Sequence, residues 1–174
     1  LASLAGADVG AAARAAKDAL AAEHERIQAL LDYKVPLAES RWARGCYLSR
    51  RFPPRLLDAD APSVGAPGIL LPFFDLLNHG KGTEIEWRGD GTSVAFAAGA
   101  AIAPNSEIFN NYGSKPNDEL LMAHGFALEN NEHDRVALKM TVASGDGRRT
   151  LGPFYLRRGG DFPRALWRAL ADPT

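Results

Sequence analysis

The chain has 174 residues, of which 46% are hydrophobic and 24% charged, a composition typical of a globular protein. Its 20 basic and 21 acidic residues give a net charge of −1, so the sequence lacks the basic excess of nucleic-acid-binding and membrane-surface proteins, and neither kind of partner is expected. The longest apolar runs, 69–74 and 94–103, are too short to span a bilayer. The single cysteine, Cys46, favours an intracellular location, with cytoplasm, nucleus and chloroplast not distinguished.

The N-terminal part of the chain is predicted to be helical. Apolar residues recur at helical spacing over 8–32, and Pro36 separates this helix from a second one over about 38–50. The following segment, 53–68, is rich in proline and glycine and is predicted to be a loop. Because the chain starts with leucine and stops just after a helix-like segment, we expect a fragment of a longer protein.

From residue 69 the pattern changes to that of strands. The apolar run 69–74 has the composition of a short buried strand. Alternating residues around a Gly-Asp-Gly turn predict a hairpin over 83–98. A further short strand is predicted over 107–109.

The C-terminal part is predicted to mix helices and a strand. Asn117 is the expected N-cap of a short helix that ends at Gly125. A strand is predicted over 135–142, a turn over 145–147 and a last helix over 162–170.

Several common enzyme signatures are absent from the sequence. It has no Walker A loop, no Gly-x-Gly-x-x-Gly turn and no Gly-x-Ser-x-Gly elbow. The four histidines lack the spacing of paired metal ligands, so no metal site is expected. One of them, His24, is predicted to be a solvated helix residue.

Two polar segments that follow apolar ones are the candidates for a functional site. They are Asp-Leu-Leu-Asn-His-Gly at 75–80 and Asn-Asn-Tyr-Gly at 110–113. Polar groups beside buried backbone must be hydrogen-bonded. Ordinary turn chemistry also explains each segment taken singly, so the residues alone leave both interpretations open.

The order and spacing of the motifs resemble the SET-domain methyltransferases, in the non-histone branch that includes the Rubisco large-subunit and actin-histidine methyltransferases. The central motifs are PFFDLLNH at 72–79, EIFNNYG at 107–113 and NDELLMAHGF at 117–126. Segments at 41–52, 130–136 and 154–166 extend the resemblance to about residues 38–170.

The resemblance implies an α+β fold, in which a β-rich SET core with a helical insertion is truncated at its N-terminus. The start of a helical C-terminal substrate-binding domain follows. The implied segments are 1–68 for the helical insertion and loop, 69–134 for the C-terminal part of the SET core and 135–174 for the incomplete substrate-binding domain. A monomer is expected. The family's Gly-rich N-terminal strand pair, which holds part of the cofactor, is missing from these residues.

The resemblance also implies S-adenosylmethionine as the cofactor, a protein as the substrate and Tyr112 as the catalytic residue. The expected cofactor-binding residues are Arg50, Asp75, Asn78, His79, Tyr112, Gly125 and Phe126. The expected substrate-binding residues are Phe52, Phe74, Asn110 and His124. Core packing is the alternative role for the three phenylalanines.

Lysine is favoured over histidine as the methyl acceptor. Phe52 and Phe74 suit the aliphatic stem of lysine and provide no hydrogen-bond partner for an imidazole. Asn110 opposes this preference, because on a strand it shares a face with Tyr112. His124 stands where the Rubisco enzyme type has a tyrosine. A histidine methyltransferase, a catalytically inactive SET-like binding module and an unrelated β-rich structural domain stay open as alternatives.

Overall fold

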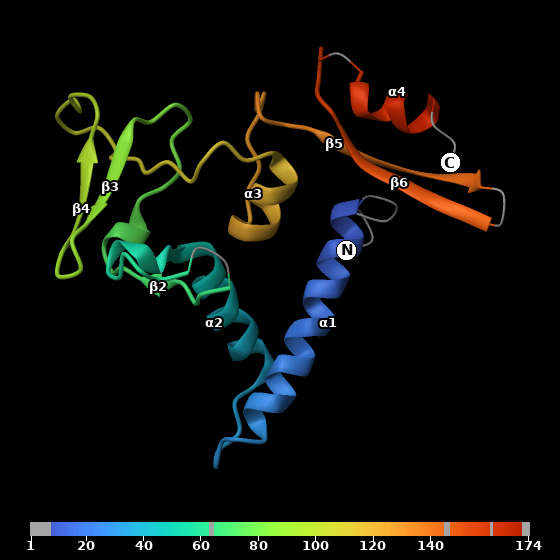
Figure 1. Ribbon diagram of the computed structural model, residues 1–174. Coiled ribbons are helices and arrows are strands. Elements are labelled where there is room, and N and C mark those ends of the chain that lie inside the picture. Colours follow the sequence, from blue (N-terminus) through green and yellow to red (C-terminus); the bar gives the residue numbers. More distant parts are fainter. Residues whose placement is uncertain (1–7, 63–64, 145–146, 161, 172–174) are drawn as a thin grey trace. The chain divides into compact units, whose positions relative to one another are not determined.

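The computed structural model describes residues 8–62, 65–144, 147–160 and 162–171 of the chain (Figure 1). Its helices and antiparallel hairpins confirm the predicted α+β class. One compact unit consists of residues 21–113, and the other of the described residues of 1–20 and 114–174. Helix α1 (Asp8–Gln28) therefore contributes residues to both units. The predicted family boundaries after residues 68 and 134 stay predictions.

Two small antiparallel pairs of strands organise the unit formed by 21–113. Helix α2 (Leu37–Arg50) follows Pro36 and continues directly into β1 (Arg51–Phe52). Strand β1 pairs with β2 (Ile69–Leu70), whereas β3 (Ile85–Gly89) and β4 (Val94–Ala98) form the predicted hairpin.

An aromatic cluster forms the core of this unit. The side chain of Phe52 is 5% exposed, and its ring lies edge-on to Trp87 at 5.3 Å and to Phe96 at 5.4 Å between centroids. Phe74 packs on Phe96 with centroids 4.3 Å apart. Such pairs contribute about 0.5–1.5 kcal/mol each beyond their buried area. The cluster therefore fastens β1 to the β3–β4 hairpin.

Gly89, at the end of β3, touches the short 3-10 helix Pro54–Leu56. A Cβ at this position would lie 1.8 Å from the carbonyl oxygen of Leu56 and 2.6 Å from its carbonyl carbon. We expect Gly89→Ala to lower the free energy of unfolding by about 1–3 kcal/mol, because backbone atoms cannot rotate away from the new methyl group. Denaturant unfolding measures this change.

Gly45 provides a matched control for this substitution. It lies inside α2, and a Cβ there would meet nothing within 4 Å. Gly45→Ala should therefore raise the free energy of unfolding by about 0.5–1 kcal/mol. Two alanine variants of equal stability would contradict the close contact at Gly89.

The other unit contains a long hairpin and two short helices. Helix α3 (Asn117–His124) precedes β5 (Val136–Ser144), β6 (Gly147–Leu156) and α4 (Arg164–Ala171). Strands β5 and β6 form one antiparallel hairpin, and α4 contacts β6 (Figure 1). Among the described residues of this unit, Leu120, Phe154 and Leu166 are buried apolar side chains.

The prediction of a buried strand over 69–74 is wrong. Only Ile69 and Leu70 pair, and they do so with the two residues of β1. Pro72 has no N–H for a ladder, and Phe73 adopts a φ of 72° with its side chain 83% exposed. A 3-10 helix over Phe74–Leu76 follows.

Other differences from the predicted elements are local. Residues 107–109 form no strand. The N-cap of α3 is Pro116, and Asn117 is the first helical residue, whereas the predicted end at Gly125 is confirmed by its φ of 83°. The first helix ends at Gln28.

Strand β6 (Gly147–Leu156), the partner of β5, was not predicted from the sequence. The predicted turn at 145–147 falls mostly outside the described residues.

His24 is half-buried and not simply solvated, because its Nδ1 lies 2.8 Å from the Ser40 hydroxyl. Among the described residues, no helix combines the length and apolarity needed to cross a membrane. In the same part of the chain, no three His, Cys, Asp or Glu side chains are grouped to hold a metal ion.

Candidate functional site

The two polar segments singled out in the sequence meet in the 21–113 unit. His79 and Asn110 form an isolated parallel bridge. The N–H of Asn110 donates to the carbonyl of Asn78 at 2.8 Å, and the N–H of Gly80 donates to the carbonyl of Asn110 at 2.9 Å. Main-chain hydrogen bonds therefore join two segments that lie far apart in the sequence.

Gly80 permits this close approach. A Cβ on it would lie 2.2 Å from the Thr83 hydroxyl and 2.6 Å from the Cβ of Phe109. The Cβ of Phe109 moves only with its main chain, and the next residue, Asn110, is held in the bridge. The glycine that follows His79 is thus required by packing.

Tyr112 is held by hydrogen bonds at its main chain and at its hydroxyl. Its N–H donates to Nδ1 of His79 at 3.1 Å, and its hydroxyl donates to the carbonyl of Leu77 at 2.7 Å. The rings of His79 and Tyr112 lie 5.4 Å apart between centroids. Because Nδ1 of His79 accepts a hydrogen bond, the neutral ring carries its proton on Nε2.

The environment of Tyr112 keeps its hydroxyl protonated. Burial is the main cause that raises its pKa above the ordinary value of 10.0. The Arg50 guanidinium lowers this pKa, and the Asp75 carboxylate raises it. Tyr112 can therefore orient or polarise a group at neutral pH, but it is no strong base.

Charged and amide groups surround the two segments. The guanidinium of Arg50 donates to the carbonyl of Asp75. The amide of Asn78 donates to Oε1 of Glu107 at 2.7 Å. The site thus offers a cation, carboxylates and an amide oxygen, a set that fits a zwitterionic ligand better than a metal ion.

Asn110 is buried, with an exposed fraction of 1%. Its Oδ1 accepts the indole N–H of Trp87 at 2.8 Å and the main-chain N–H of Asn111 at 2.7 Å. Both lone pairs of this oxygen are therefore engaged within the protein. This geometry explains why the polar side chain of Asn110 is tolerated in the core.

The two predicted substrate-binding phenylalanines of this unit lie in or beside its aromatic core. Phe52 has the core packing that the sequence left as its alternative role. Phe74 also lines an apolar cavity of about 760 Å³, together with Phe73, Phe96 and Phe109. A substrate channel formed by Phe52 and Phe74 stays a prediction.

The remaining predicted site residues belong to the other unit, at the end of α3. The ring centroids of His124 and Phe126 are 6.2 Å apart. Gly125 between them ends the helix, and its N–H donates to two carbonyls within α3 at 3.0 and 3.1 Å. Their contacts with cofactor or substrate stay predictions.

Sequence reasoning did not identify the partners that hold the site. Trp87 binds Asn110, Glu107 binds Asn78, and the Leu77 carbonyl binds Tyr112. Only Trp87 had a signal in the sequence, because a tryptophan on the inward face of a hairpin needs an acceptor for its N–H.

Comparison with known proteins relates the chain to protein methyltransferases. It is 36% identical over 101 residues to ribosomal lysine N-methyltransferase 1 of Saccharomyces cerevisiae. The aligned residues make up 58% of this chain and 17% of that protein. It is 38% identical over 104 residues to ribosomal lysine N-methyltransferase set10 of Schizosaccharomyces pombe, an alignment of 58% of this chain and 18% of that protein. It is 27% identical over 134 residues to the actin-histidine N-methyltransferase of Mus musculus, an alignment of 73% of this chain and 22% of that protein.

The chain thus spans about a fifth of the length of these curated relatives. No family model matches it. Protein N-methylation, which the sequence motifs predicted, is the activity that the relatives' names share, and the two more similar relatives are named for lysine.

Proposed function

We propose that the protein is an S-adenosylmethionine-dependent protein-lysine N-methyltransferase with a SET-type core of the Rubisco methyltransferase branch. The observation that carries this proposal is the bridge between His79 and Asn110, which joins two motif segments and holds Tyr112 against His79. The names of the relatives support the reaction and the acceptor.

The charged groups around the bridge fit this cofactor. Arg50 provides a guanidinium suited to the α-carboxylate, while Asn78 keeps an amide oxygen opposite the N–H that it donates to Glu107. The faces of His79 and Tyr112 tolerate a positive charge nearby. S-adenosylmethionine, when bound, would supply a methyl group on a sulfonium, so that the neutral amine could bond to the methyl carbon in line while the carbon–sulfur bond breaks and the neutral thioether leaves.

The protein's own contribution to this reaction is positioning. Tyr112 is fixed through its N–H and its hydroxyl, so its ring and oxygen are held before any ligand arrives. Rigid placement of reacting groups accounts for a large part of such a barrier reduction.

The hydrogen bonds of Asn110 favour lysine as the acceptor. An imidazole that is methylated on one nitrogen carries a proton on the other, and that N–H needs an acceptor in a closed site. Oδ1 of Asn110 is already engaged by Trp87 and Asn111, so the residue that opposed the lysine assignment does not provide this acceptor.

Calorimetric titration of the full-length protein with S-adenosylmethionine tests the proposal. We expect heat of binding with one cofactor per chain. A folded protein that gives no heat would instead favour the inactive binding module.

A competition assay tests the acceptor. Two peptides that differ only in Lys or His at the target position are offered together to the full-length protein with methyl-labelled cofactor. We expect at least about fivefold more label on the Lys peptide, because an imidazole N–H left buried without an acceptor costs about 1–3 kcal/mol. Label mainly on the His peptide would show that the acceptor is histidine.

The natural substrate is sought first among ribosomal proteins. Both relatives at 36% and 38% identity are named for ribosomal lysine methylation. Salt-washed ribosomes incubated with the protein and labelled cofactor provide the assay.

A further inference from the structure

The apolar cavity of the 21–113 unit opens to solvent through exposed hydrophobic side chains. Its volume of about 760 Å³ is in the range of ligand-binding pockets, and all its lining residues belong to this one unit. Four apolar residues of its lining are more than a third exposed: Phe73, Ile102, Ile108 and Phe109. A contiguous apolar surface that stays exposed is typical of a binding site.

Phe73 is held at the rim of this cavity in a strained conformation. Its φ of 72° and ψ of −43° lie outside the regions that residues with a side chain favour. The N–H of Asp75 donates to the Leu71 carbonyl at 3.1 Å, and the N–H of Leu76 donates to the Phe73 carbonyl at 3.3 Å, so the turn is fixed on both sides. Glycine would fit this backbone better, and the exposed ring buries little surface. Strain of this kind is found mainly at binding and catalytic sites.

The charge on the cavity is negative. Two carboxylates line it, Glu84 and Glu107, and none of the described lining side chains is a cation. Glu107 accepts the amide of Asn78, which is neutral, so this carboxylate keeps its charge. Glu86 lies two residues after Glu84 but is paired with Arg88 at 2.6 Å. The cavity therefore complements a partner that is both apolar and basic.

The cavity shares a wall with the candidate site. Leu77 lines the cavity, while its main-chain carbonyl accepts the hydroxyl of Tyr112 at 2.7 Å. Glu107 also lines the cavity and binds Asn78. A segment seated in the cavity therefore lies next to the candidate site without occupying it.

We propose that this cavity is a docking site for the protein substrate, which takes an apolar side chain and an adjacent lysine or arginine from a segment outside the methylated residue. The inference rests on the proposed function, in which the substrate is a protein. Ribosomal proteins, among which that substrate is sought, fit this chemistry because nucleic-acid-binding proteins carry a basic excess. The apolar side chain packs against Phe73, and the cation lies between Glu84 and Glu107.

Peptide binding to the full-length protein without cofactor provides the first test. Three labelled peptides of equal length and the same glycine–serine background are compared by fluorescence anisotropy. One contains leucine and lysine, the second leucine and glutamate, and the third lysine without leucine. We expect saturable binding of the leucine–lysine peptide, at least about fivefold tighter than that of the other two, because each lacks either the apolar anchor or the cation.

Substitutions in the cavity should weaken this binding without loss of stability. Phe73→Gly removes the aromatic anchor and should weaken binding about fivefold or more, while the melting temperature stays the same or rises because glycine tolerates a φ of 72°. Glu84→Gln should weaken binding about two- to fivefold, the effect of one surface charge. Glu86→Gln is the matched control, since Glu86 does not line the cavity and is paired with Arg88, and it should leave the affinity unchanged.

Steady-state methylation of salt-washed ribosomes separates docking from chemistry. Phe73→Gly should raise KM by the factor by which it weakens peptide binding and leave kcat unchanged, because the cavity does not hold the methylated amine. An unchanged KM, or a kcat that falls as well, would overturn the docking site and leave the proposed function standing. A folded protein that methylates no substrate would overturn the proposed function, and the docking of a substrate with it.

Two other occupants of the cavity give different results. If a second copy of the chain filled it, the unsubstituted protein would sediment as a dimer and Phe73→Gly as a monomer. If another segment of the full-length protein filled it, Phe73→Gly would lower the melting temperature, and the leucine–lysine peptide would not bind the unsubstituted protein. Either result would overturn the proposal.

Discussion

Replacing Tyr112 by phenylalanine should reduce the turnover of the full-length protein about 10²–10³-fold, the typical effect of removing one polar group aimed at a transition state. The fold should persist. The ring keeps its contact with His79, and the variant loses the hydrogen bond that the hydroxyl donates to the Leu77 carbonyl. Loss of that hydrogen bond lowers the free energy of unfolding by about 1 kcal/mol. Single-turnover methylation and thermal unfolding measure the two effects.

Tyr33→Phe is the matched control, because the side chain of Tyr33 is 66% exposed. It should change neither rate nor stability. Unchanged methylation in the Tyr112 variant would refute the catalytic role. A rate that falls only in proportion to the folded fraction would show that Tyr112 has a structural role alone.

The pH dependence of this effect has a definite sign. Burial raises the pKa of Tyr112, so its hydroxyl stays protonated to higher pH than in an exposed tyrosine. The rate ratio between the unsubstituted protein and the variant should therefore stay constant over about pH 6–9, below the ordinary tyrosine pKa. A ratio that rises steeply within this range would indicate that the ionised hydroxyl acts as a base.

Elements with a strong local pattern were predictable from the sequence. The helical periodicity that predicts α1, the Pro36 break before α2 and the Gly-Asp-Gly turn of the β3–β4 hairpin are all local signals. Gly125 ends α3 as predicted, since a residue with a φ of 83° favours glycine.

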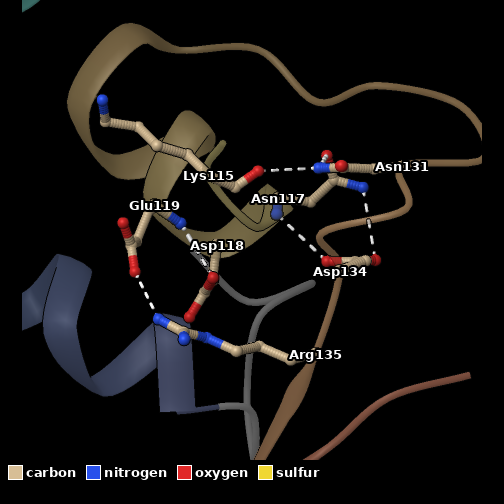
Figure 2. A network of polar contacts seen from close by, with 7 residues as sticks. All are labelled: Lys115, Asn117, Asp118, Glu119, Asn131, Asp134 and Arg135. Carbon is tan, nitrogen blue, oxygen red and sulfur yellow. Dashed lines mark hydrogen bonds and ion pairs between the residues drawn. The ribbon is translucent and has the colours of Figure 1, made fainter. Parts of the chain in front are cut away.

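Elements that depend on distant partners were not predictable in this way. The run 69–74 is apolar, but the sequence does not reveal which strand it meets, and only two of its residues pair. The N–H of Asn117 at the start of α3 donates to Asp134 (Figure 2), and no local rule connects that carboxylate to the start of the helix. Asn117 was predicted to be the N-cap because sequence patterns take into account only the residues adjacent to the helix along the chain.

The same limit applies to the candidate site. The order of the family motifs placed His79 and Tyr112 together, and the structure joins them directly. The roles of Phe52 and Asn110 depend on which side chains surround them. Both have partners in the core, and those partners follow from the tertiary path of the chain.

Asn110→Leu should destabilise the protein by about 2–6 kcal/mol, because leucine fills a similar volume but accepts no hydrogen bond. The indole N–H of Trp87 and the main-chain N–H of Asn111 would both lose their acceptor in a buried position, at about 1–3 kcal/mol each. Denaturant unfolding at neutral pH measures this loss.

A double-mutant cycle with Trp87→Phe isolates the hydrogen bond between the two side chains. The phenylalanine removes the indole donor, so Asn110→Leu in that background leaves only the Asn111 N–H without its acceptor. The double variant should therefore be more stable than the sum of the single losses by about 1 kcal/mol or more. Additive losses would mean that the indole bond contributes nothing.

If the bond does hold, the Asn110 oxygen is committed to the core, and Asn110→Leu should leave the preference for the Lys peptide unchanged in whatever fraction stays folded. A changed ratio of label between the Lys and His peptides would show that Asn110 contacts the substrate.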